Sequence, residues 1–392
     1  MKISILLPSL ASNGIARAWI LANLLERHYE VETLGFLRPD ESVFPWFADY
    51  PWGEVRAATM REGMRRMEDR ITGDIVLAYG VSMTSFGVGL LAKRRRRIPL
   101  ILDMPEWEVH DHWKRDSSLG RAWVISKNLF GPGWDNAHSF KYRYVLDQLT
   151  GFADERLVCC RFLEERYGGV LLPQGPDIDL FDPARFDKRA LRRKWGIPEE
   201  ATVFFFGGNP MPNKGVDETI AAINALAGKV DARLVIAGRD DTHPYTRRMI
   251  ELSPGKVIAL GPQPFELMPE LLATADIVAL PQTRKEPKSL GYVPCKMYEA
   301  MAMGIPVISS DLCDIPEILD GCGYVVPHDD AAALQNKIEY VLTNPDEARE
   351  VGKRARQRVI ERYAWDVMDG ILHDAVESVI ARRGLRTTRA AA

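Results

Sequence analysis

Short apolar runs alternate with amphipathic segments along the whole of this 392-residue chain. Such alternation is typical of parallel β-sheets whose strands are joined by covering helices. The runs typical of strands are residues 3–7, 31–36, 74–78, 100–102 and 157–159 in the first half, and residues 203–206, 234–237, 257–260, 277–280, 307–309 and 324–326 in the second half. The sequence therefore predicts an α/β protein with two sets of parallel strands.

A segment rich in Pro, Gly and Asp, residues 172–183, separates the two sets of strands. This composition is typical of a linker, and a length of 392 residues suggests roughly two to three domains. We predict two doubly wound, Rossmann-like domains that face each other across a cleft, at residues 1–183 and 184–363. Residues 364–392 are predicted to form a C-terminal helix followed by a disordered tail.

The composition is that of an ordinary globular protein, with 46% hydrophobic and 27% charged residues. A net charge of −3 gives no indication of nucleic-acid binding. The five cysteines follow neither a disulfide framework nor a metal-binding spacing, which favours a reducing, cytoplasmic location. We expect the N-terminal residues to form a first strand and not a signal peptide. No run approaches the roughly 20 apolar residues that span a bilayer.

Residues 291–317 carry the most informative local pattern of the chain. An amphipathic helix with a lone carboxylate, Glu299, runs to Met303, and Gly304 is suited to a left-handed helix end. The β-branched run that includes Pro306 predicts a buried parallel strand. A carboxylate near the end of such a helix points toward the carboxyl ends of the strands, where open α/β sheets bind ligands.

The same stretch resembles a known family. The run EAMAMGIPV from Glu299 to Val307, followed by Pro316-Glu317, is similar to the signature of the retaining glycosyltransferases of the GT-B fold, family four, also called glycosyl transferases group 1. The resemblance implies two Rossmann-like domains and a last helix that crosses back to the N-terminal domain. It also implies transfer of a sugar from a nucleoside diphosphate sugar to a saccharide or lipid-linked acceptor, in polysaccharide or glycolipid synthesis, without a metal or other cofactor.

The resemblance implies that the diphosphate of the donor binds to the glycine-rich loop after the first strand of the second half. Lys214-Gly215 match the family pattern there, whereas Asn209, next to Gly208, stands where the family has an arginine. A lysine at a helix start beside backbone donors suits a diphosphate, although a solvated lysine would show the same pattern. Loss of a charge-assisted contact costs roughly 1.5–3 kcal/mol unless another cation replaces it. The candidates for that cation are Arg284, Lys285 and Lys288.

Two more loops are implied to contact the donor. Backbone groups of the loop that contains Gln263 are expected to bind the base. The backbone amides expected to hold the sugar are those of Leu290, Gly291 and Tyr292. Gly291 stands where the family has the first of two glutamates, so that carboxylate is absent from this chain.

The second glutamate of the family corresponds to Glu299, which is expected to accept hydrogen bonds from the ribose hydroxyls of the donor. Lys296, one turn earlier on the same helix, is a further candidate donor contact. The alternative for both residues is a salt bridge between them, because side chains three residues apart on a helix are neighbours.

In the first half, two places are implied to face the sugar or the acceptor. A loop with Gly14 precedes a helix, whose N-terminal N–H groups suit an anion; a plain turn is the alternative. A predicted strand ends in Asp103 and Glu106, which match acids of the family, while Pro105 stands where the family has a histidine. These two acids are the candidate catalytic residues, orienting sugar hydroxyls in a front-face transfer that needs no protein nucleophile. Two downstream histidines could supply an imidazole, although each is more typical of a solvated loop: His110 and His112.

Five consecutive basic residues, Lys93 to Arg97, lie at the end of a predicted helix. Cations stabilise a helix C-terminus, which accounts for one or two of them. A block of this size also suits an anionic membrane surface, at about 1 kcal/mol per basic residue. We therefore predict a peripheral contact with the inner face of the membrane, as for an acceptor carried on a lipid.

Two other functions fit this sequence. One is a GT-B enzyme of another class, such as a sugar-nucleotide epimerase or a glycogen-type synthase, which would be expected to retain the missing arginine and first glutamate. The other is a catalytically silent relative that binds a nucleotide sugar or scaffolds a partner enzyme. The substitutions at Pro105, Asn209 and Gly291 favour this second alternative, whereas Lys214 and Glu299 favour retained donor binding.

Overall fold

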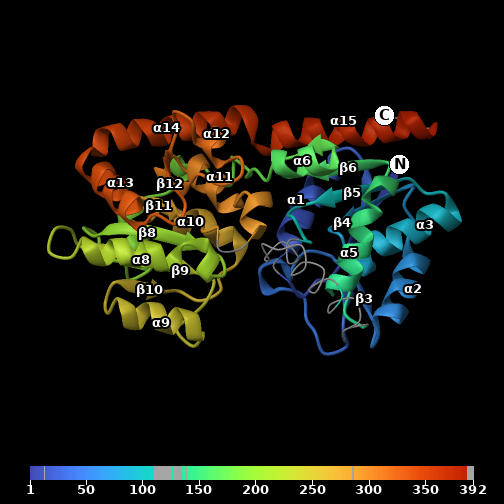
Figure 1. Ribbon diagram of the computed structural model, residues 1–392, viewed down its shortest axis with the longest axis horizontal. Coiled ribbons are helices and arrows are strands. Elements are labelled where there is room, and N and C mark those ends of the chain that lie inside the picture. Colours follow the sequence, from blue (N-terminus) through green and yellow to red (C-terminus); the bar gives the residue numbers. More distant parts are fainter. Residues whose placement is uncertain (13, 110–125, 127–134, 138, 285–286, 386–392) are drawn as a thin grey trace. The chain divides into compact units, whose positions relative to one another are not determined.

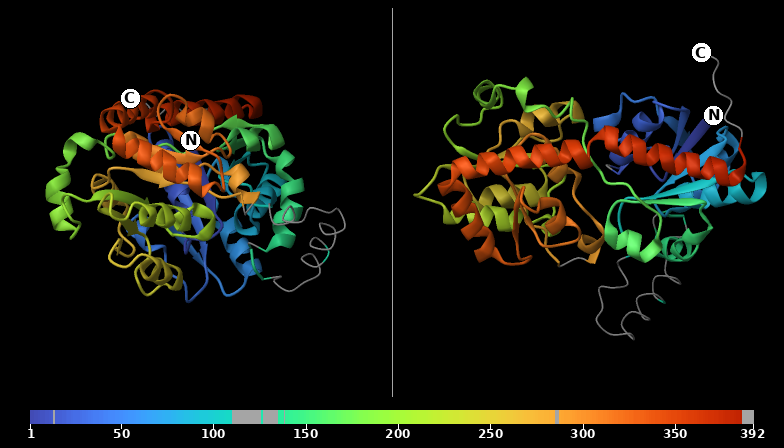
Figure 2. Two further views of the ribbon diagram at one scale, coloured as in Figure 1. Left: turned by 60° about the vertical axis from the view of Figure 1, so that its left-hand side comes forward. Right: turned by 90° about the horizontal axis from the view of Figure 1, so that it is seen from above.

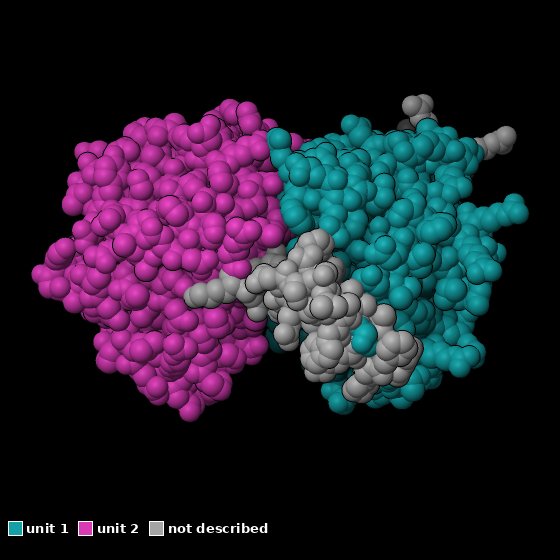
Figure 3. Space-filling model, in the orientation of Figure 1, with its two compact units in different colours: residues 1–173, 368–392 teal, residues 174–367 magenta. Residues whose placement is uncertain are grey.

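The structure, a computed structural model, describes residues 1–12, 14–109, 126, 135–137, 139–284 and 287–385 (Figure 1). The chain forms two compact units, residues 1–173 with 368–392, and residues 174–367 (Figure 3). The sequence suggested a first boundary after residue 183, whereas in the structure this boundary lies after Pro173. The second boundary lies inside the last helix and not before it, because that helix continues from the second unit into the first.

Seven parallel strands form the sheet of the first unit, in the order β3-β2-β1-β4-β5-β6-β7. Their bounds are β1 (Lys2–Leu7), β2 (Glu30–Leu37), β3 (Gly53–Arg56), β4 (Ile75–Tyr79), β5 (Leu100–Met104), β6 (Glu155–Val158) and β7 (Val170–Leu171). The chain order reverses between β1 and β4, so the carboxyl ends of these two strands flank the position where doubly wound sheets bind ligands. Each run predicted in the first half overlaps one of these strands, whereas β3 and β7 were not predicted.

Helices and short helical turns connect the strands of the first unit (Figure 1). They are α1 (Ile15–Leu25), η1 (Pro45–Phe47), α2 (Met60–Arg70), η2 (Met83–Gly87), α3 (Val88–Arg96), α5 (Phe140–Gln148), η4 (Thr150–Phe152) and α6 (Arg161–Tyr167). Their ends follow ordinary capping chemistry: the Thr59 hydroxyl accepts a hydrogen bond from the Glu62 N–H at the start of α2, at 3.3 Å. At the end of α3, Arg97 adopts a left-handed conformation.

The last helix, α15 (Trp365–Arg383), lies at the red end of the ribbon in Figure 2 and packs on the first unit from Met368 onward. Its buried residues in that unit are Met368, Leu372, Ala375, Val376, Val379 and Ile380. The Tyr29 hydroxyl also donates to the Glu377 carboxylate at 2.8 Å. Apolar burial and this hydrogen bond hold the helix on the unit.

The second unit contains two three-stranded parallel sheets, in the orders β10-β9-β8 and β11-β12-β13. Their bounds are β8 (Thr202–Gly207), β9 (Ala232–Ala237), β10 (Val257–Ala259), β11 (Val278–Leu280), β12 (Val307–Ser310) and β13 (Tyr324–Val326). A parallel bridge between Phe204 and Ile277 joins β8 to the start of β11, so the six strands act as one doubly wound sheet. All six runs predicted in the second half overlap these strands, which confirms the predicted α/β architecture.

The helices of the second unit are α7 (Lys188–Lys194), α8 (Val216–Ala225), α9 (Pro244–Leu252), α10 (Met268–Leu272), α11 (Cys295–Ala302), α12 (Ile315–Leu319), α13 (Ala331–Thr343) and α14 (Pro345–Arg362). Four 3-10 turns accompany them: η5 (Pro183–Arg185), η6 (Pro212–Lys214), η7 (Phe265–Leu267) and η8 (Pro287–Gly291). Gly304 follows α11 with φ +66, so the predicted left-handed end of this helix is confirmed. No helix in the part of the chain that the structure describes is long and apolar enough to cross a membrane.

Candidate functional site

The loop between β8 and α8 places Lys214 at the carboxyl edge of the second unit's sheet. The Lys214 Nζ donates a hydrogen bond to the backbone oxygen of Asn209 at 2.7 Å. Gly215 follows with φ +73, and a Cβ at this position would overlap the backbone oxygen of Pro281. Because only glycine fits this turn, the Lys214-Gly215 pair fixes where the ammonium group leaves the backbone.

Helix α11 brings a second lysine to the same edge. The Lys296 Nζ lies 4.0 Å from the centre of the Phe206 ring, a cation–π contact, and faces Gly208. No ion pair joins Lys296 to Glu299 among the described residues, so the alternative of a salt bridge along the helix is not found. Burial lowers the pKa of the Lys296 ammonium, while the negative charges near it oppose that shift.

Glu299 lies deep in this edge, although part of its side chain remains accessible. Burial raises the pKa of its carboxyl to about 7, while Lys296 and a hydrogen bond from the Cys295 thiol act in the opposite direction. Burial and the charge of Glu299 raise the pKa of Cys295 to about 12, so the thiol is neutral. The edge therefore holds a carboxylate that a hydroxyl-bearing ligand could stabilise by donating hydrogen bonds.

A small cavity lies between Lys214 and Lys296. It is lined by Phe206, Lys214, Leu280, Gln282, Tyr292, Pro294 and Lys296. The Gln282 side chain is 5% exposed, and its Nε2 has no hydrogen-bond partner among the described residues. Two ammonium groups and an unsatisfied amide N–H are a donor set that suits phosphate oxygens. Gln282 was missed in the sequence because a single glutamine after a strand gives no signal.

The other predicted donor residues lie on loops of the same unit. Gly291 is buried at the end of η8, and Tyr292 reaches the cavity. Leu290 precedes them in the same turn. The Gln263 Nε2 donates to the backbone oxygen of Leu260 at 2.6 Å and so closes its own loop. The roles of these residues in binding a sugar or a base stay predictions.

Asp103 does not suit the predicted direct contact with a sugar. It is the fourth residue of β5 and is 0% exposed. Both carboxylate oxygens are bonded to Arg17 of α1, at 2.7 Å from Nη2 and 2.9 Å from Nε. Two further guanidinium hydrogens bond to the backbone oxygens of Leu172 and Pro173, at 3.0 and 3.1 Å. We therefore correct the role of Asp103 to that of a buried partner that fixes α1 and the end of the first unit.

Glu106 is half-buried just beyond β5. It lies near Tyr79, the last residue of β4, whose pKa is raised well above its ordinary value by burial and by the charges of Asp103 and Glu106. Glu108, which the sequence did not single out, accepts the Val81 N–H at 2.7 Å and lies 3.5 Å from Arg143. Glu106 is thus the better placed of the two predicted acids, and its catalytic role stays a prediction. The alternatives His110 and His112 lie outside the described residues.

Gly14 lies next to the hydroxyl of Tyr79, at the start of α1. Its φ of −62 is open to any residue, and a Cβ there would meet its nearest neighbours only at ordinary contact distance, 3.4 Å. The protein itself therefore does not require glycine at this position. The predicted anion contact at this helix start is neither supported nor opposed by the local geometry.

Intramolecular partners account for three members of the basic block, more than the sequence suggested. Lys93 pairs with Asp154 at 2.8 Å, and Arg95 pairs with Glu68 at 2.7 Å. Arg96 donates to the backbone oxygen of Ile71, just past the end of α2, at 3.0 Å. Arg94 and Arg97 are exposed. A membrane contact therefore depends on these two residues and stays a prediction.

Three residues were candidates to replace the arginine that is absent at Asn209. The first of them, Arg284, is exposed, and its backbone N–H donates a hydrogen bond to the Asp329 carboxylate at 3.1 Å. Lys285 lies outside the described residues, and of Lys288 only the backbone, within η8, is described. None of the three is shown at the loop of Asn209.

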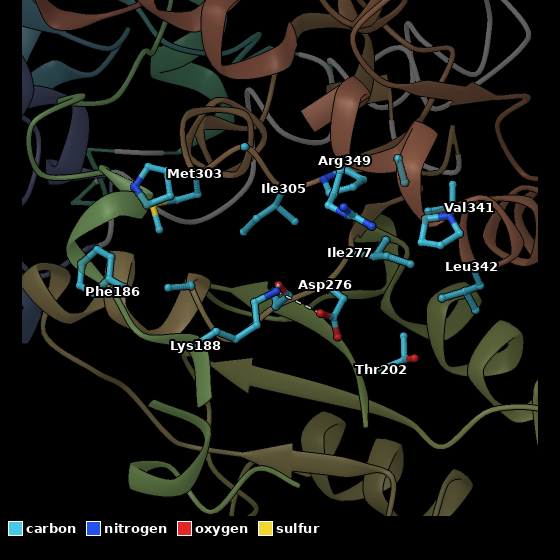
Figure 4. Close-up of a pocket in the computed structure, with 17 residues that line it drawn as sticks. Phe186, Lys188, Thr202, Asp276, Ile277, Met303, Ile305, Val341, Leu342 and Arg349 are labelled. Atoms are coloured by element: carbon cyan, nitrogen blue, oxygen red, sulfur yellow. Dashed lines mark hydrogen bonds and ion pairs between the residues drawn. The ribbon is translucent and has the colours of Figure 1, made fainter. Parts of the chain in front are cut away.

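A larger cavity of the second unit, about 560 Å³, lies elsewhere (Figure 4). Its lining includes Thr202 and Ile277, near the amino ends of β8 and β11, and none of the predicted site residues. Lys188 and Asp276 face each other across it and pair at 3.0 Å. Apolar side chains line most of the remainder, among them Phe186. Arg349, the remaining charged residue of the lining, pairs with Asp346. Because the charged residues of this lining are paired, the cavity suits a diphosphate less well than the carboxyl edge does.

Residues 187–358, nearly all of the second unit, match the sequence model of the family described as glycosyl transferases group 1. The second unit is a domain of that family. The predicted family is thus confirmed for the part of the chain that holds the Lys214 and Glu299 motifs.

Curated relatives match parts of the group 1 domain and of the rest of the chain. The GDP-mannose-dependent monoacylated alpha-(1-6)-phosphatidylinositol monomannoside mannosyltransferase of Corynebacterium glutamicum is 30% identical over 214 residues, which is 53% of this chain. The MMP alpha-(1->4)-mannosyltransferase of Mycolicibacterium hassiacum is 28% identical over 357 residues, which is 88% of this chain. The chain spans about half the length of the first relative, 55%, and 79% of the second.

Solved structures resemble this protein along nearly its whole length. Alr3699/HepE of Anabaena, solved in complex with UDP-glucose, superposes with a TM-score of 0.73 at 18% sequence identity. The likeness covers 96% of this chain and 100% of that one. At this identity the likeness shows the fold, which is GT-B as predicted.

Proposed function

We propose that this protein is a retaining glycosyltransferase that moves a sugar from a nucleoside diphosphate sugar to a saccharide or lipid-linked acceptor. One observation carries the proposal: Lys214 and Lys296 line one small cavity at the carboxyl edge of a group 1 domain, and Glu299, one turn after Lys296 on α11, lies close enough for the Lys296 charge to lower its pKa. Two cations suit the diphosphate, and the buried carboxylate suits the ribose hydroxyls.

In this proposal the donor is held by its charges and by main-chain groups. Lys214 and Lys296 balance the developing negative charge on the leaving diphosphate, which lowers the barrier to breaking the glycosidic bond. Backbone amides around Gly291 hold the sugar, and the loop of Gln263 binds the base. No metal ion is needed in this scheme, because the ammonium groups take its electrostatic role.

The names of the relatives suggest which substrates to test first. The Corynebacterium protein is named as GDP-mannose-dependent and acts on a phosphatidylinositol monomannoside. The Anabaena structure contains UDP-glucose. We therefore propose GDP-mannose and UDP-glucose as first donors and a glycolipid as first acceptor. The five free cysteines suit a reducing compartment, so we propose a cytoplasmic site of action, at or near the membrane.

Donor binding and hydrolysis by the whole protein test the proposal. Thermal shift across UDP-, GDP-, ADP- and TDP-sugars should show stabilisation by one nucleotide class, about 2.7 kcal/mol when the ligand is at a hundredfold its dissociation constant. Released nucleotide measures turnover, and chelator should leave it unchanged. Lys214→Ala should lose both signals, because an ammonium contact with a diphosphate contributes roughly 1.5–3 kcal/mol. Lys353→Ala, on the exposed face of α14, is the matched control and should keep them.

The anomeric configuration of the product tests the retaining mechanism. Transfer followed by NMR should give a product with the same configuration as the donor, and inversion would contradict this part of the proposal. The second candidate, a catalytically silent relative, is favoured by the residues at Pro105, Asn209 and Gly291. Stabilisation by a sugar nucleotide without turnover on any acceptor tested would support this candidate.

A further inference from the structure

Two cations bond to a single residue of the loop after β8. The Lys214 Nζ donates to the backbone oxygen of Asn209 at 2.7 Å, and the Arg239 Nε donates to its side-chain oxygen at 3.0 Å. Arg239 lies two residues after the end of β9, so it reaches this loop from the neighbouring strand. Asn209 thus holds two positive charges at one place on the carboxyl edge of the sheet.

Close backbone contacts fix the two loops against each other. The Gly208 N–H donates to the Ala237 oxygen at 2.6 Å, and the Gly238 N–H donates to the Gly261 oxygen at 2.8 Å. Gly238 has φ +152, and a Cβ there would overlap the backbone oxygen of Gly208. Any other residue would push the loops apart, so the chain keeps Arg239 and Asn209 adjacent through its backbone.

Only one edge of the Arg239 guanidinium is used by the protein. The side chain is exposed, and within the described part of the chain its two Nη groups have no hydrogen-bond or ion-pair partner. The adjacent carboxylate of Asp240 accepts instead from the backbone N–H of Thr242, at 3.1 Å. A guanidinium held through Nε with both Nη groups open can donate paired hydrogen bonds to a phosphate.

We propose that Arg239 is a further cation of the donor site and binds the diphosphate together with Lys214 and Lys296. The inference rests on the proposed function, since it names a binding residue of that same site. Arg239 takes the place of the arginine that is absent at Asn209: the guanidinium comes from the neighbouring strand, and Asn209 positions it.

Affinity for a nucleoside diphosphate tests this assignment. The probe is whichever of UDP, GDP, ADP and dTDP binds the wild-type protein most tightly, titrated by calorimetry. Arg239→Gln should weaken binding roughly tenfold to hundredfold, the value of one charge-assisted contact. Arg239→Lys should recover part of the loss, because it keeps the charge without the paired geometry. Arg248→Gln removes the same charge from the exposed face of α9 and should change affinity by less than about twofold.

The matching nucleoside, which carries no phosphate, separates a direct contact from a disturbed loop. Arg239→Gln should leave the affinity for the nucleoside, measured by competition, as in the wild type. Two results would overturn the inference. In one, Arg239→Gln weakens the affinity for the nucleoside as much as the affinity for the diphosphate; in the other, it leaves the affinity for the diphosphate unchanged. The proposed function would stand in both cases. If the wild type binds none of the four diphosphates, the proposed function fails and the inference fails with it.

Discussion

At the scale of single residues, the carboxyl edge of the group 1 domain buries two ionisable groups, Lys296 and Glu299, whose charged forms are disfavoured by burial. Burial lowers the pKa of Lys296 and raises that of Glu299, so each side chain is biased toward its neutral form. The two do not neutralise each other through an ion pair, because Lys296 lies over the Phe206 ring. A diphosphate would pair with the Lys296 ammonium and ribose hydroxyls with the Glu299 carboxylate, which links the shifted pKa values of this edge to the proposed ligand.

Glu299→Gln is predicted to stabilise the protein at pH 8 and not at pH 5. The folded-state pKa of about 7 lies above the ordinary value of 4.5. The protonated carboxyl therefore favours folding below pH 4.5, and this contribution is lost as the pH rises through 7. The full effect is on the order of 3 kcal/mol. Urea unfolding at the two pH values measures the difference.

The exposed residue Glu200 provides the control, since Glu200→Gln should change stability little at either pH. Saturation with the donor should narrow the difference in unfolding free energy between Glu299→Gln and the wild type at pH 8. Hydrogen bonds from the ribose would stabilise the Glu299 carboxylate of the wild type and not the amide of the variant. Equal stability of Glu299→Gln and the wild type at pH 8 would show that Glu299 titrates as an ordinary solvated carboxyl.

At the scale of secondary structure elements, the packing of α11 on α14 holds the Glu299 helix in place. A Cβ on Gly352, in the middle of α14, would overlap the backbone oxygen of Gly304, just after α11. Gly352→Ala would gain about 1 kcal/mol in helix propensity but would force the two helices apart, at roughly 1–3 kcal/mol. We expect net destabilisation and a rise in the KM for the donor, measured by urea unfolding and steady-state kinetics.

Gly370→Ala is the matched control for Gly352→Ala. Gly370 lies inside the helix α15, is exposed, and has no atom within 4 Å of the position a Cβ would occupy. The substitution should therefore stabilise the protein by up to about 1 kcal/mol. If both substitutions stabilised, the contact between α11 and α14 would not be close enough to matter.

Most of the strands that the sequence predicted are strongly buried, although β10 was predicted without a fully buried residue. β8, with the sequence TVFFFG, is buried at four of its six positions, and such continuous apolar runs are visible in a sequence. β3, with the sequence GEVR, buries only Val55, and β7 has two residues, neither of them fully buried. Both lie at the edges of the sheet, where strands pair with one neighbour and need little apolar sequence.

At the scale of the whole molecule, the chain has two doubly wound units and a last helix shared between them. Each unit gathers its functional candidates at the carboxyl ends of its strands: Gly14 and Glu106 in the first, and Lys214 and Glu299 in the second. The basic block lies away from these edges, at the end of α3. In the predicted role, the basic block would hold the first unit at an anionic membrane surface.

Arg94→Glu with Arg97→Glu reverses the two charges of the basic block that have no partner among the described residues, and is predicted to weaken binding to anionic vesicles. At about 1 kcal/mol per basic residue, the loss should be roughly thirtyfold or more at low salt. Co-sedimentation with phosphatidylserine vesicles measures it. Arg349→Glu with Lys353→Glu, on α14, applies the same charge change to the second unit and should have little effect. Unchanged retention of the Arg94 and Arg97 variant would rule out a membrane contact through this block.

The sequence by itself determined what is encoded in local periodicity and short motifs. Apolar runs of strand length specified eleven of the strands, because burial on both faces of a sheet requires them. The turn at Gly304 and the Lys214-Gly215 loop were visible because each requires a particular residue type at a fixed position. The tertiary structure alone decided the partners: Arg17 meets Asp103, 86 residues away, and Arg239 meets Asn209, 30 residues away. Polar pairing of this kind depends on which strands become neighbours, and no local pattern in a single chain records that choice.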